Sequence, residues 1–243
     1  MLAIFKKEFN SFFSSAVGYL IIGFFLLLNG LFLWVFKGSY NVLEYGFANL
    51  SQFFLFTPWI FLLIIPAITM KSFSEEKKTG TLELLFIKPV GKLHLIGGKF
   101  LAAFVLVLLA LFPTLLYVYT ISNLGITPGN YDFGLVLGSY IGLVLLVMGY
   151  TAIGIFCSAI TANQIVAFLL SFLLCFLFYY GFEALASAND GNNTSDFIKN
   201  IGMKYHFDGI ALGVLKLQNI LYFISLTVLF LYLANVQLNY SKR

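Results

Sequence analysis

Residues 71–99 read KSFSEEKKTGTLELLFIKPVGKLHLIGGK and separate two long apolar runs of the chain. They carry six lysines, three glutamates and one histidine, more charge than any other stretch of this length. Charges at this density are too costly to place in lipid. The stretch therefore predicts a loop in water between two membrane spans. Its position determines on which side of the membrane the other loops lie.

The rest of the chain has the composition of a polytopic membrane protein. Of its 243 residues, 60% are hydrophobic and only 10% charged, whereas a soluble domain has about 25% charged residues. The mean hydropathy is +0.95. We therefore expect an all-α polytopic membrane protein, and we interpret the net charge of +4 through topology, not through nucleic-acid binding. Cys157 and Cys175 lie in apolar runs and are interpreted as packing residues.

Six apolar runs are long enough to cross a bilayer as helices, which takes about 20 residues each. The expected spans are 17–36, 53–70, 100–121, 133–157, 164–182 and 219–238. An even number of spans places both termini and residues 71–99 on one side of the membrane. That side holds ten of the 14 Lys and Arg residues. Because loops rich in Lys and Arg stay in the cytoplasm, both termini are expected to be cytoplasmic.

Residues 1–16 have the pattern of an amphipathic helix that lies in the membrane interface. Its apolar face consists of Leu2, Phe5, Phe9, Phe12, Phe13 and Ala16. Lys6 and Lys7 lie on the opposite face, where they would meet anionic headgroups. We therefore expect Phe5, Phe9 and these two lysines to anchor the helix, and we divide the chain into this helix and a membrane domain over residues 17–243.

The fourth span carries Gly134, Gly138 and Gly142 at intervals of four residues. Small residues at this spacing let two helix backbones pack closely in a membrane. The partner helix belongs either to the same subunit or to a second subunit across a dimer seam, and the spacing leaves both open. The outer segment 183–218 is expected to begin as a flexible polar loop and then to fold back against the outer membrane surface.

Turn and cap residues divide the 71–99 stretch into short helices. Ser72 and Glu75 have the spacing of a capping box, and Gly80 suits the left-handed conformation that ends a helix. Thr81 would cap a second helix, which Pro89 stops. Its apolar face would consist of Leu82, Leu85 and Phe86. A groove on a partner could receive this helix; the alternative is a solvated loop that only fixes topology.

The segment EEKKTGTLELL at 75–85, followed by Lys88-Pro89-Val90 and Gly98-Lys99, resembles the loop of ABC-2 type transporter permeases. The resemblance covers the whole chain and implies an exporter-like fold with an N-terminal elbow helix and six spans. It implies that this loop carries the coupling helix that contacts a separate ATP-binding subunit. The residues expected to transmit force there are Glu75, Glu76, Gly80, Thr81, Glu83, Leu84, Leu85 and Pro89.

Four fragments are similar to GldF, the permease subfamily associated with gliding motility. They are FKKEFNSFFSSAVGYL, FLWVFKGSYN, PTLLYVYTIS and NQIVAFLLSFLLCFLFYYGFE. The resemblance implies a bacterial inner-membrane protein whose partners are an ATP-binding subunit, a second identical or different permease subunit, membrane lipid and further motility proteins. The acidic residues that related permeases often carry near the start of the last span are absent from residues 213–219, so their role is not carried over.

The chain has no ATP site of its own. A Walker A motif needs G-x-x-x-x-G-K-[ST], but Leu93 occupies the first glycine position before Gly98-Lys99, and Phe100 follows the lysine. We therefore expect no enzymatic activity, cofactor or metal site in this chain, and Mg-ATP on the partner subunit.

Three other functions compete with the permease. An ion-coupled secondary transporter needs ionisable side chains within its spans, and the expected spans have essentially none, since Glu183 lies just beyond the fifth. An intramembrane protease with an E-E-x-x-x-R motif would need arginine where Gly80 stands. A scaffold that anchors a motility or secretion assembly without transport is compatible with the sequence.

Overall fold

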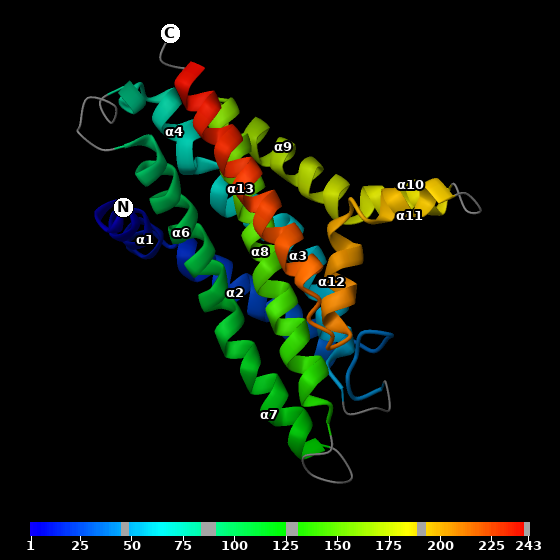
Figure 1. Ribbon diagram of the computed structural model, residues 1–243. Helices are drawn as coiled ribbons and strands as arrows, with labels where there is room; N and C mark the ends of the chain where they lie inside the picture. Colours follow the sequence, from blue (N-terminus) through cyan, green and yellow to red (C-terminus); the bar gives the residue numbers. More distant parts are fainter. Residues whose placement is uncertain (45–48, 84–90, 125–130, 189–192, 241–243) are drawn as a thin grey trace.

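The structure is a computed structural model that describes residues 1–44, 49–83, 91–124, 131–188 and 193–240 (Figure 1). These residues are nearly all helical and contain no strand. The first half comprises α1 (Leu2–Ser14), α2 (Val17–Gly30), the π-helical turn η1 (Leu31–Val35), α3 (Ser51–Thr69), α4 (Lys71–Lys78), α6 (Lys92–Leu111), the 3₁₀ turn η2 (Phe112–Thr114) and α7 (Leu115–Leu124). The second half comprises α8 (Phe133–Ile160), α9 (Gln164–Phe176), the π-helical turn η3 (Leu177–Gly181), α10 (Phe182–Ser187), α11 (Asn193–Lys199), α12 (Met203–Ala211) and α13 (Leu217–Tyr240).

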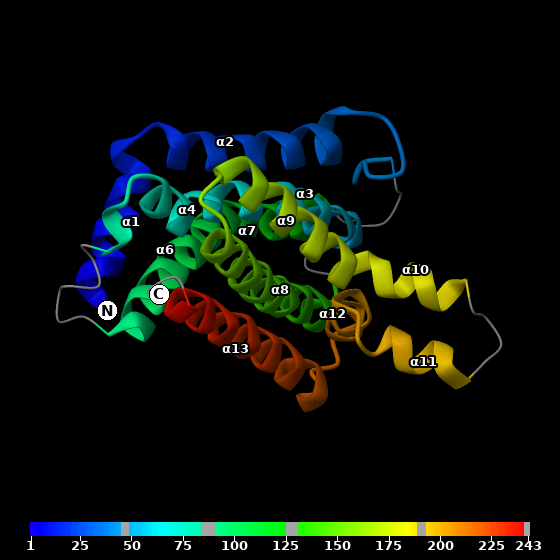
Figure 2. The ribbon, with the colours of Figure 1, turned by 90° about the horizontal axis from the view of Figure 1, so that it is seen from above.

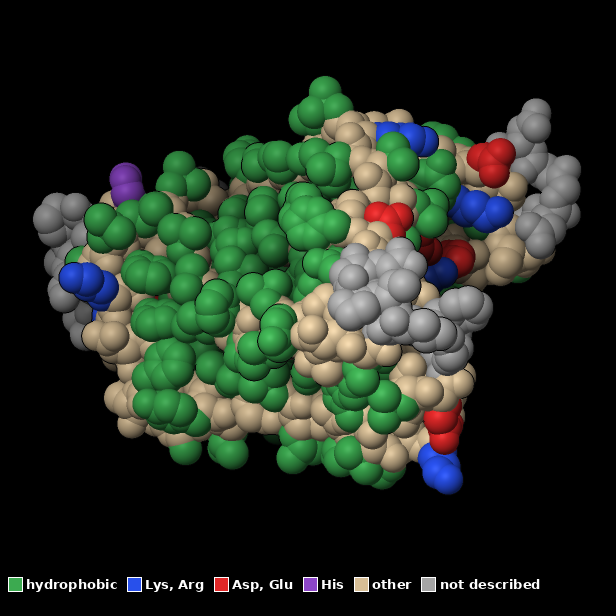
Figure 3. All heavy atoms as spheres, turned by 90° about the horizontal axis from the view of Figure 1, so that it is seen from below, with side chains coloured by type: hydrophobic (Ala, Val, Ile, Leu, Met, Phe, Trp, Pro, Cys, Tyr) green, Lys and Arg blue, Asp and Glu red, His purple; other side chains and the backbone are tan. Residues whose placement is uncertain are grey.

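The prediction of six membrane spans is confirmed. Six helical segments of the described residues are long and apolar enough to cross a bilayer. They are Val17–Val35, Ser51–Lys78, Lys92–Leu124, Phe133–Ile160, Gln164–Ser187 and Leu217–Asn239. Figure 3 shows apolar side chains over the middle of one face of the molecule and charged side chains towards its two ends. This is the distribution that an apolar layer of lipid imposes on spanning helices.

Helix α8 forms the centre of the bundle. It packs against α3, α9, α12 and α13, and Figure 2 shows α2 and α13 on opposite sides of it. Between helices in lipid there is little hydrophobic driving force, so close packing at small residues holds them together. Gly154 illustrates this, because a Cβ atom there would clash with the Thr69 side chain of α3. The outer helices α2 and α9 leave apolar side chains exposed, among them Leu20 and Leu169.

The charged stretch 71–99 contains more helix than the sequence predicts. Only Met70 separates α3 from α4, so the second span continues as helix to Lys78, and α6 already begins at Lys92. The capping box is wrong, because Ser72 lies inside α4 and Met70 precedes that helix without a side-chain cap. Charges mark where a span leaves lipid, but a helix can continue into water beyond that point.

The outer segment also contains more helix than expected. The start of the expected flexible loop folds as α10, and α11 lies beside it (Figures 1 and 2). Residues 182–187 read FEALAS, and the Glu, Ala and Leu residues there favour helix. Helix α12 packs against α8 and α13, and its residues Met203, His206, Phe207 and Ile210 are buried. The expected position of this part of the segment against the outer membrane surface stays a prediction.

Candidate functional site

A buried lysine joins α1, α4 and α6 at one end of the bundle. The Lys99 Nζ of α6 donates to Glu8 Oε1 of α1 at 3.1 Å and to Glu76 Oε1 of α4 at 2.8 Å. It also donates to the Ser72 carbonyl at 2.6 Å, and it lies 5.0 Å from the centre of the Phe73 ring. The Lys99 side chain is only 2% exposed. We call these five residues the Lys99 junction.

The charges of the Lys99 junction are unbalanced. One ammonium faces two carboxylates, and Glu76 Oε2 is buried without a hydrogen-bond partner among the described residues. A buried charge needs a partner, because removing it from water costs several kcal/mol. Lys99 therefore holds two acids together that would repel each other without it.

Two glycines let α1 reach this position. A Cβ atom on Gly98 would lie 2.9 Å from the Ile4 Cβ, and one on Gly97 would lie 3.3 Å from the Met1 Sδ. Helix α1 therefore packs directly on the backbone of α6, and Glu8, one turn after Ile4, is brought to Lys99. Phe5 and Phe9 lie half-buried and stacked at 5.5 Å between ring centroids.

The expected anchor residues divide between two faces of α1. Lys6 and Lys7 are exposed, while Phe5 and Phe9 are half-buried. This is the distribution that an interfacial helix requires.

Helix α4 is also fixed to the end of the central helix α8. Ser158 Oγ accepts hydrogen bonds from the backbone N–H groups of Phe73 at 2.8 Å and Ser74 at 3.1 Å, and it donates to the Met70 carbonyl at 3.1 Å. The Lys77 ammonium donates to the Ala159 carbonyl. One hydroxyl group of α8 therefore binds the break between α3 and α4.

The exposed residues of α4 and of the segment that follows it form a polar surface at this end of the molecule. Gly80 adopts the left-handed conformation, with a φ of 71°, and turns the chain after α4. We define the end surface by its exposed members Glu75, Lys78, Gly80, Thr81 and Glu83.

Four of the residues expected to couple to a partner lie on the end surface. The four are Glu75, Gly80, Thr81 and Glu83. Glu76 instead pairs inside the Lys99 junction. Leu82, expected on the docking face, is 5% exposed and packs into the core, so that expectation is wrong. Leu84, Leu85 and Pro89 lie outside the described residues.

The glycines of the fourth span face helix α12 of the same chain. A Cβ atom on Gly138 would lie 2.7 Å from the Ile210 carbonyl oxygen, and one on Gly142 would lie 3.2 Å from the Phe207 ring. Gly134 approaches Gly213, the residue at which the chain turns towards α13 with a φ of 80°. Gly138 and Gly142 therefore contact a segment of their own subunit.

Two of the three charged members of the Lys99 junction were missed in the sequence analysis. Glu8 and Lys99 are separated by 91 positions, and nothing in their spacing pairs them. One signal was available for each. Glu8 is the only acid in the first 43 residues, and Lys99 interrupts an otherwise apolar run directly after two glycines. The expected third span began one residue after Lys99, so the lysine was assigned to the loop.

The two ends of the described chain lie at the same end of the bundle as α4 (Figure 2). Lys92 Nζ donates to the Asn239 Oδ1 of α13 at 2.5 Å, and Glu8 reaches Lys99 from α1. Within the described residues, no group of three His, Cys, Asp or Glu side chains could hold a metal ion. Cys157 and Cys175 are free and buried.

Comparison with known proteins identifies one family. Residues 2–243 match the family model described as "ABC-2 family transporter protein". No curated protein matches the chain.

Proposed function

Because the chain belongs to the ABC-2 transporter family, we propose that it is the exporter-type permease subunit of an ABC transporter and is driven from the cytosol. Members of this family are membrane components that are generally not catalytic themselves, and they work with an ATP-binding subunit. We assign the end surface, Glu75 to Glu83, to the contact with that subunit.

The observation that supports this proposal is the continuity between the end surface and the core. A load on the end surface reaches α4, which the Lys99 junction ties to α1 and α6. Ser158 and Ala159 tie the same helix to α8. ATP-driven closure of the partner would therefore move the elbow helix, the third span and the central span together. A loop that only fixed topology would need none of these contacts.

The finer assignments rest on charge and resemblance. The excess of Lys and Arg at the end that carries α4 supports cytoplasmic termini. The fragments similar to GldF support a bacterial inner-membrane transporter with a role in gliding motility. We further propose a second permease subunit, which the resemblance to ABC-2 permeases implies; the exposed apolar residues of α2 and α9, among them Leu20, Phe24 and Leu169, leave surface where it would pack.

The test is co-purification of the tagged full chain from its native membrane in mild detergent. A stoichiometric ATPase partner is expected in the eluate. Charge reversal at Glu75 and Glu83, both exposed, should lower its recovery without affecting insertion, while Asp196→Lys at the other end is the matched control. Equal recovery in all variants would remove the end surface from the contact. A chain that purifies without any ATPase would favour the scaffold.

A further inference from the structure

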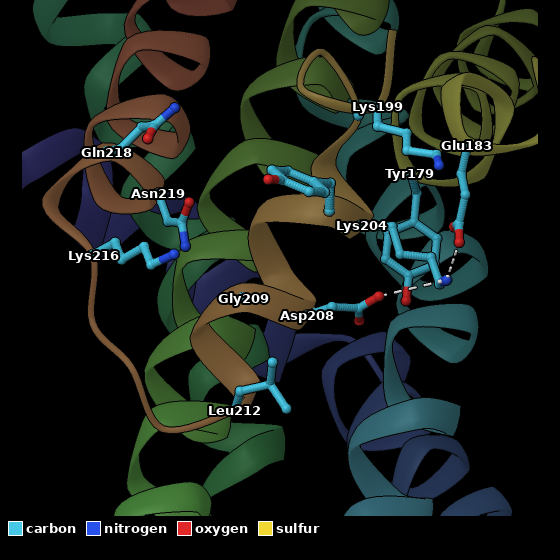
Figure 4. A pocket seen from close by; sticks show the side chains of 12 residues that line it. Tyr179, Glu183, Lys199, Lys204, Asp208, Gly209, Leu212, Lys216, Gln218 and Asn219 are labelled. Carbon is cyan, nitrogen blue, oxygen red and sulfur yellow. Dashed lines mark hydrogen bonds and ion pairs between the residues drawn. The ribbon is translucent and has the colours of Figure 1, made fainter. Parts of the chain in front are cut away.

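A polar cavity lies at the end of the molecule opposite the Lys99 junction. Its volume is about 470 Å³, and it lies between the end of the fifth span, α12 and the start of α13 (Figure 4). We call it the outer cavity. Asn219, at the start of α13, lines it and contacts the ring of His206 on α12. His206 is only 2% exposed, so its state is transmitted to the cavity through Asn219.

Both ring nitrogens of His206 face an oxygen atom. Nε2 lies 2.9 Å from the Asn200 carbonyl oxygen, and Nδ1 lies 2.9 Å from the Asn219 Oδ1. A carbonyl oxygen only accepts hydrogen bonds, so Nε2 must carry a hydrogen to bond Asn200. Nδ1 must also carry a hydrogen to bond Oδ1. The arrangement is therefore that of the imidazolium ion, in which both nitrogens donate.

The rings next to His206 suit a positive charge. The Tyr222 ring is stacked on the His206 ring, with 4.0 Å between the centroids and an angle of 20° between the planes. The Tyr205 ring meets it edge-on at 5.4 Å. Among the described residues, these two tyrosines are the titratable side chains in ring contact with His206. The face of an aromatic ring attracts a cation, so Tyr222 stabilises the imidazolium form.

The charged groups in the neighbourhood belong to the outer cavity. The elements α8, η3 and α13, which pack against α12, contain no Asp, Glu, Lys or Arg residue. Lys204 on α12 lies 2.6 Å from Glu183 Oε1 and 3.5 Å from Asp208 Oδ2, so it is neutralised by two acids. The charged side chains that line the cavity are Glu183, Lys199, Lys204, Asp208 and Lys216. The charge of His206 is therefore stabilised by two oxygen acceptors and an aromatic ring.

A second arrangement satisfies the same side chains when the ring is neutral. Loss of the Nδ1 hydrogen leaves a lone pair of His206 opposite the lone pairs of the Asn219 Oδ1. A half turn of the Asn219 carboxamide exchanges its oxygen and nitrogen ends, and Nδ2 then donates to Nδ1. Nδ2 now points to Gly209, where an added Cβ atom would lie 2.8 Å from it. The glycine leaves space there for either end of the carboxamide.

We propose that His206 and Asn219 form a proton-linked switch in the wall of the outer cavity. When His206 is charged, Asn219 Oδ1 accepts from the ring and its amino group faces Gly209, which also lines the cavity. When His206 is neutral, the amino group donates to the ring and the oxygen takes its place. The wall thus favours hydrogen-bond acceptors at low pH and donors at high pH. Imidazole suits this role, because it changes charge between about pH 5 and 8.

The protonation of His206 is tested by NMR on the purified full chain in detergent, with ¹⁵N in the histidine rings. The chain has only two histidines, and His94→Gln leaves His206 as the one signal. Both ring nitrogens are expected to carry a hydrogen at low pH, and Nε2 alone at high pH. A hydrogen on Nδ1 alone at high pH, or a ring that stays neutral throughout, would overturn the switch. The ATP-binding subunit is not needed, so the result is independent of the proposed transport function.

The turn of the carboxamide has its own signal. A through-space NMR contact between the Asn219 amino group and the Gly209 α-hydrogens is expected at low pH. It should disappear at high pH, when the amino group contacts the His206 ring instead. The exposed side-chain amide of Gln218 is the control and should not change its contacts. A contact between Asn219 and Gly209 that persists over the whole titration would disprove the turn.

Variants of Asn219 test the link between the two groups. Asn219→Asp presents only oxygen to the ring and should move the midpoint of the His206 titration to higher pH. Asn219→Leu removes the acceptor and should move it to lower pH by about 1–2 pH units, as one hydrogen bond to a charged group predicts. Gln218→Leu is the matched control and should leave it unchanged. The same midpoint in the wild type and both Asn219 variants would disprove the link.

Discussion

Lys99 shows how strongly one side chain can determine helix packing in a chain that is only 10% charged. Among the described residues, it is the one buried charge shared by three helices at the end where we place the partner. Glu76 could be singled out from the sequence, because it lies in a recognisable charged motif. The role of Glu76 could not be predicted, because Lys99, which pairs with it, is 23 positions away on a different span. Pairing across spans depends on helix packing, and a single sequence does not encode helix packing locally.

Replacing Lys99 should destabilise the protein strongly. Lys99→Met keeps the length of the side chain but leaves Glu8 and Glu76 facing each other, and breaking a buried ion pair costs about 3–5 kcal/mol. Thermal unfolding in detergent should show a clearly lower midpoint. The control is Lys71→Met, which removes an exposed lysine of α4.

The double variant Lys99→Met with Glu76→Gln removes one of the two stranded charges and should recover part of the loss. If it were no more stable than Lys99→Met alone, the ion pair would not be the cause of the loss.

Asp208 should make stability depend on pH. Burial raises its pKa above the ordinary value of 3.8, although Lys204 opposes this. An acid whose pKa is higher in the folded than in the unfolded protein loses stability as the pH rises from the unfolded pKa through the folded one. The unfolding midpoint of Asp208→Asn should therefore rise relative to that of the wild type as the pH is raised from about 4 to neutral. The exposed Asp196→Asn should run parallel to the wild type.

At the scale of single elements, the spans were predictable and their ends were not. Apolar runs of about 20 residues are a strong signal, because a single segment in lipid can satisfy its own backbone hydrogen bonds only as a helix. The ends were missed at Lys78 and Lys92, where helices continue into the charged stretch, and at α10 and α11. A helix is stable in water as well as in lipid, so the change from apolar to charged residues marks the membrane surface and not the end of the helix.

The contact between α8 and α12 should be sensitive to a single methyl group. A Cβ atom at Gly138 would meet the Ile210 carbonyl oxygen at 2.7 Å, and a backbone atom cannot rotate away. Gly138→Ala should therefore displace α12 and cost about 1–3 kcal/mol. Hydrogen–deuterium exchange should be faster in Met203–Ala211. Gly30→Ala is the control, because its Cβ would meet nothing within 4 Å. Unchanged exchange in α12 would show that the contact tolerates the methyl group.

At the scale of the whole molecule, the two ends were predictable and the arrangement of helices between them was not. An even number of spans places the two ends of the described chain at the end of the bundle that carries α4 (Figure 2). The order of helices around α8 leaves little trace, because the spans are apolar on every side. The glycines at Gly138 and Gly142 indicated a close contact, but only the structure shows that α12 makes it.

Labelling of single cysteines tests the arrangement of the two ends. Lys78 and Asp196 are exposed at opposite ends of the molecule, and the native Cys157 and Cys175 are buried, so background labelling should be low. A membrane-impermeant thiol reagent should modify Asp196→Cys in intact cells and Lys78→Cys only after permeabilisation. Modification of both in intact cells would contradict the six-span topology.

The Lys99 junction also has a consequence for the order of biogenesis. Its three charged residues lie at positions 8, 76 and 99, so all are present once the third span has left the ribosome. Chains fold from the N-terminus during synthesis, at about 5–20 residues per second. The Lys99 junction can thus form before α8 exists, whereas Ser158 of α8 can fix α4 only later. A nascent chain arrested after the third span should already protect Lys99 from amine-reactive reagents.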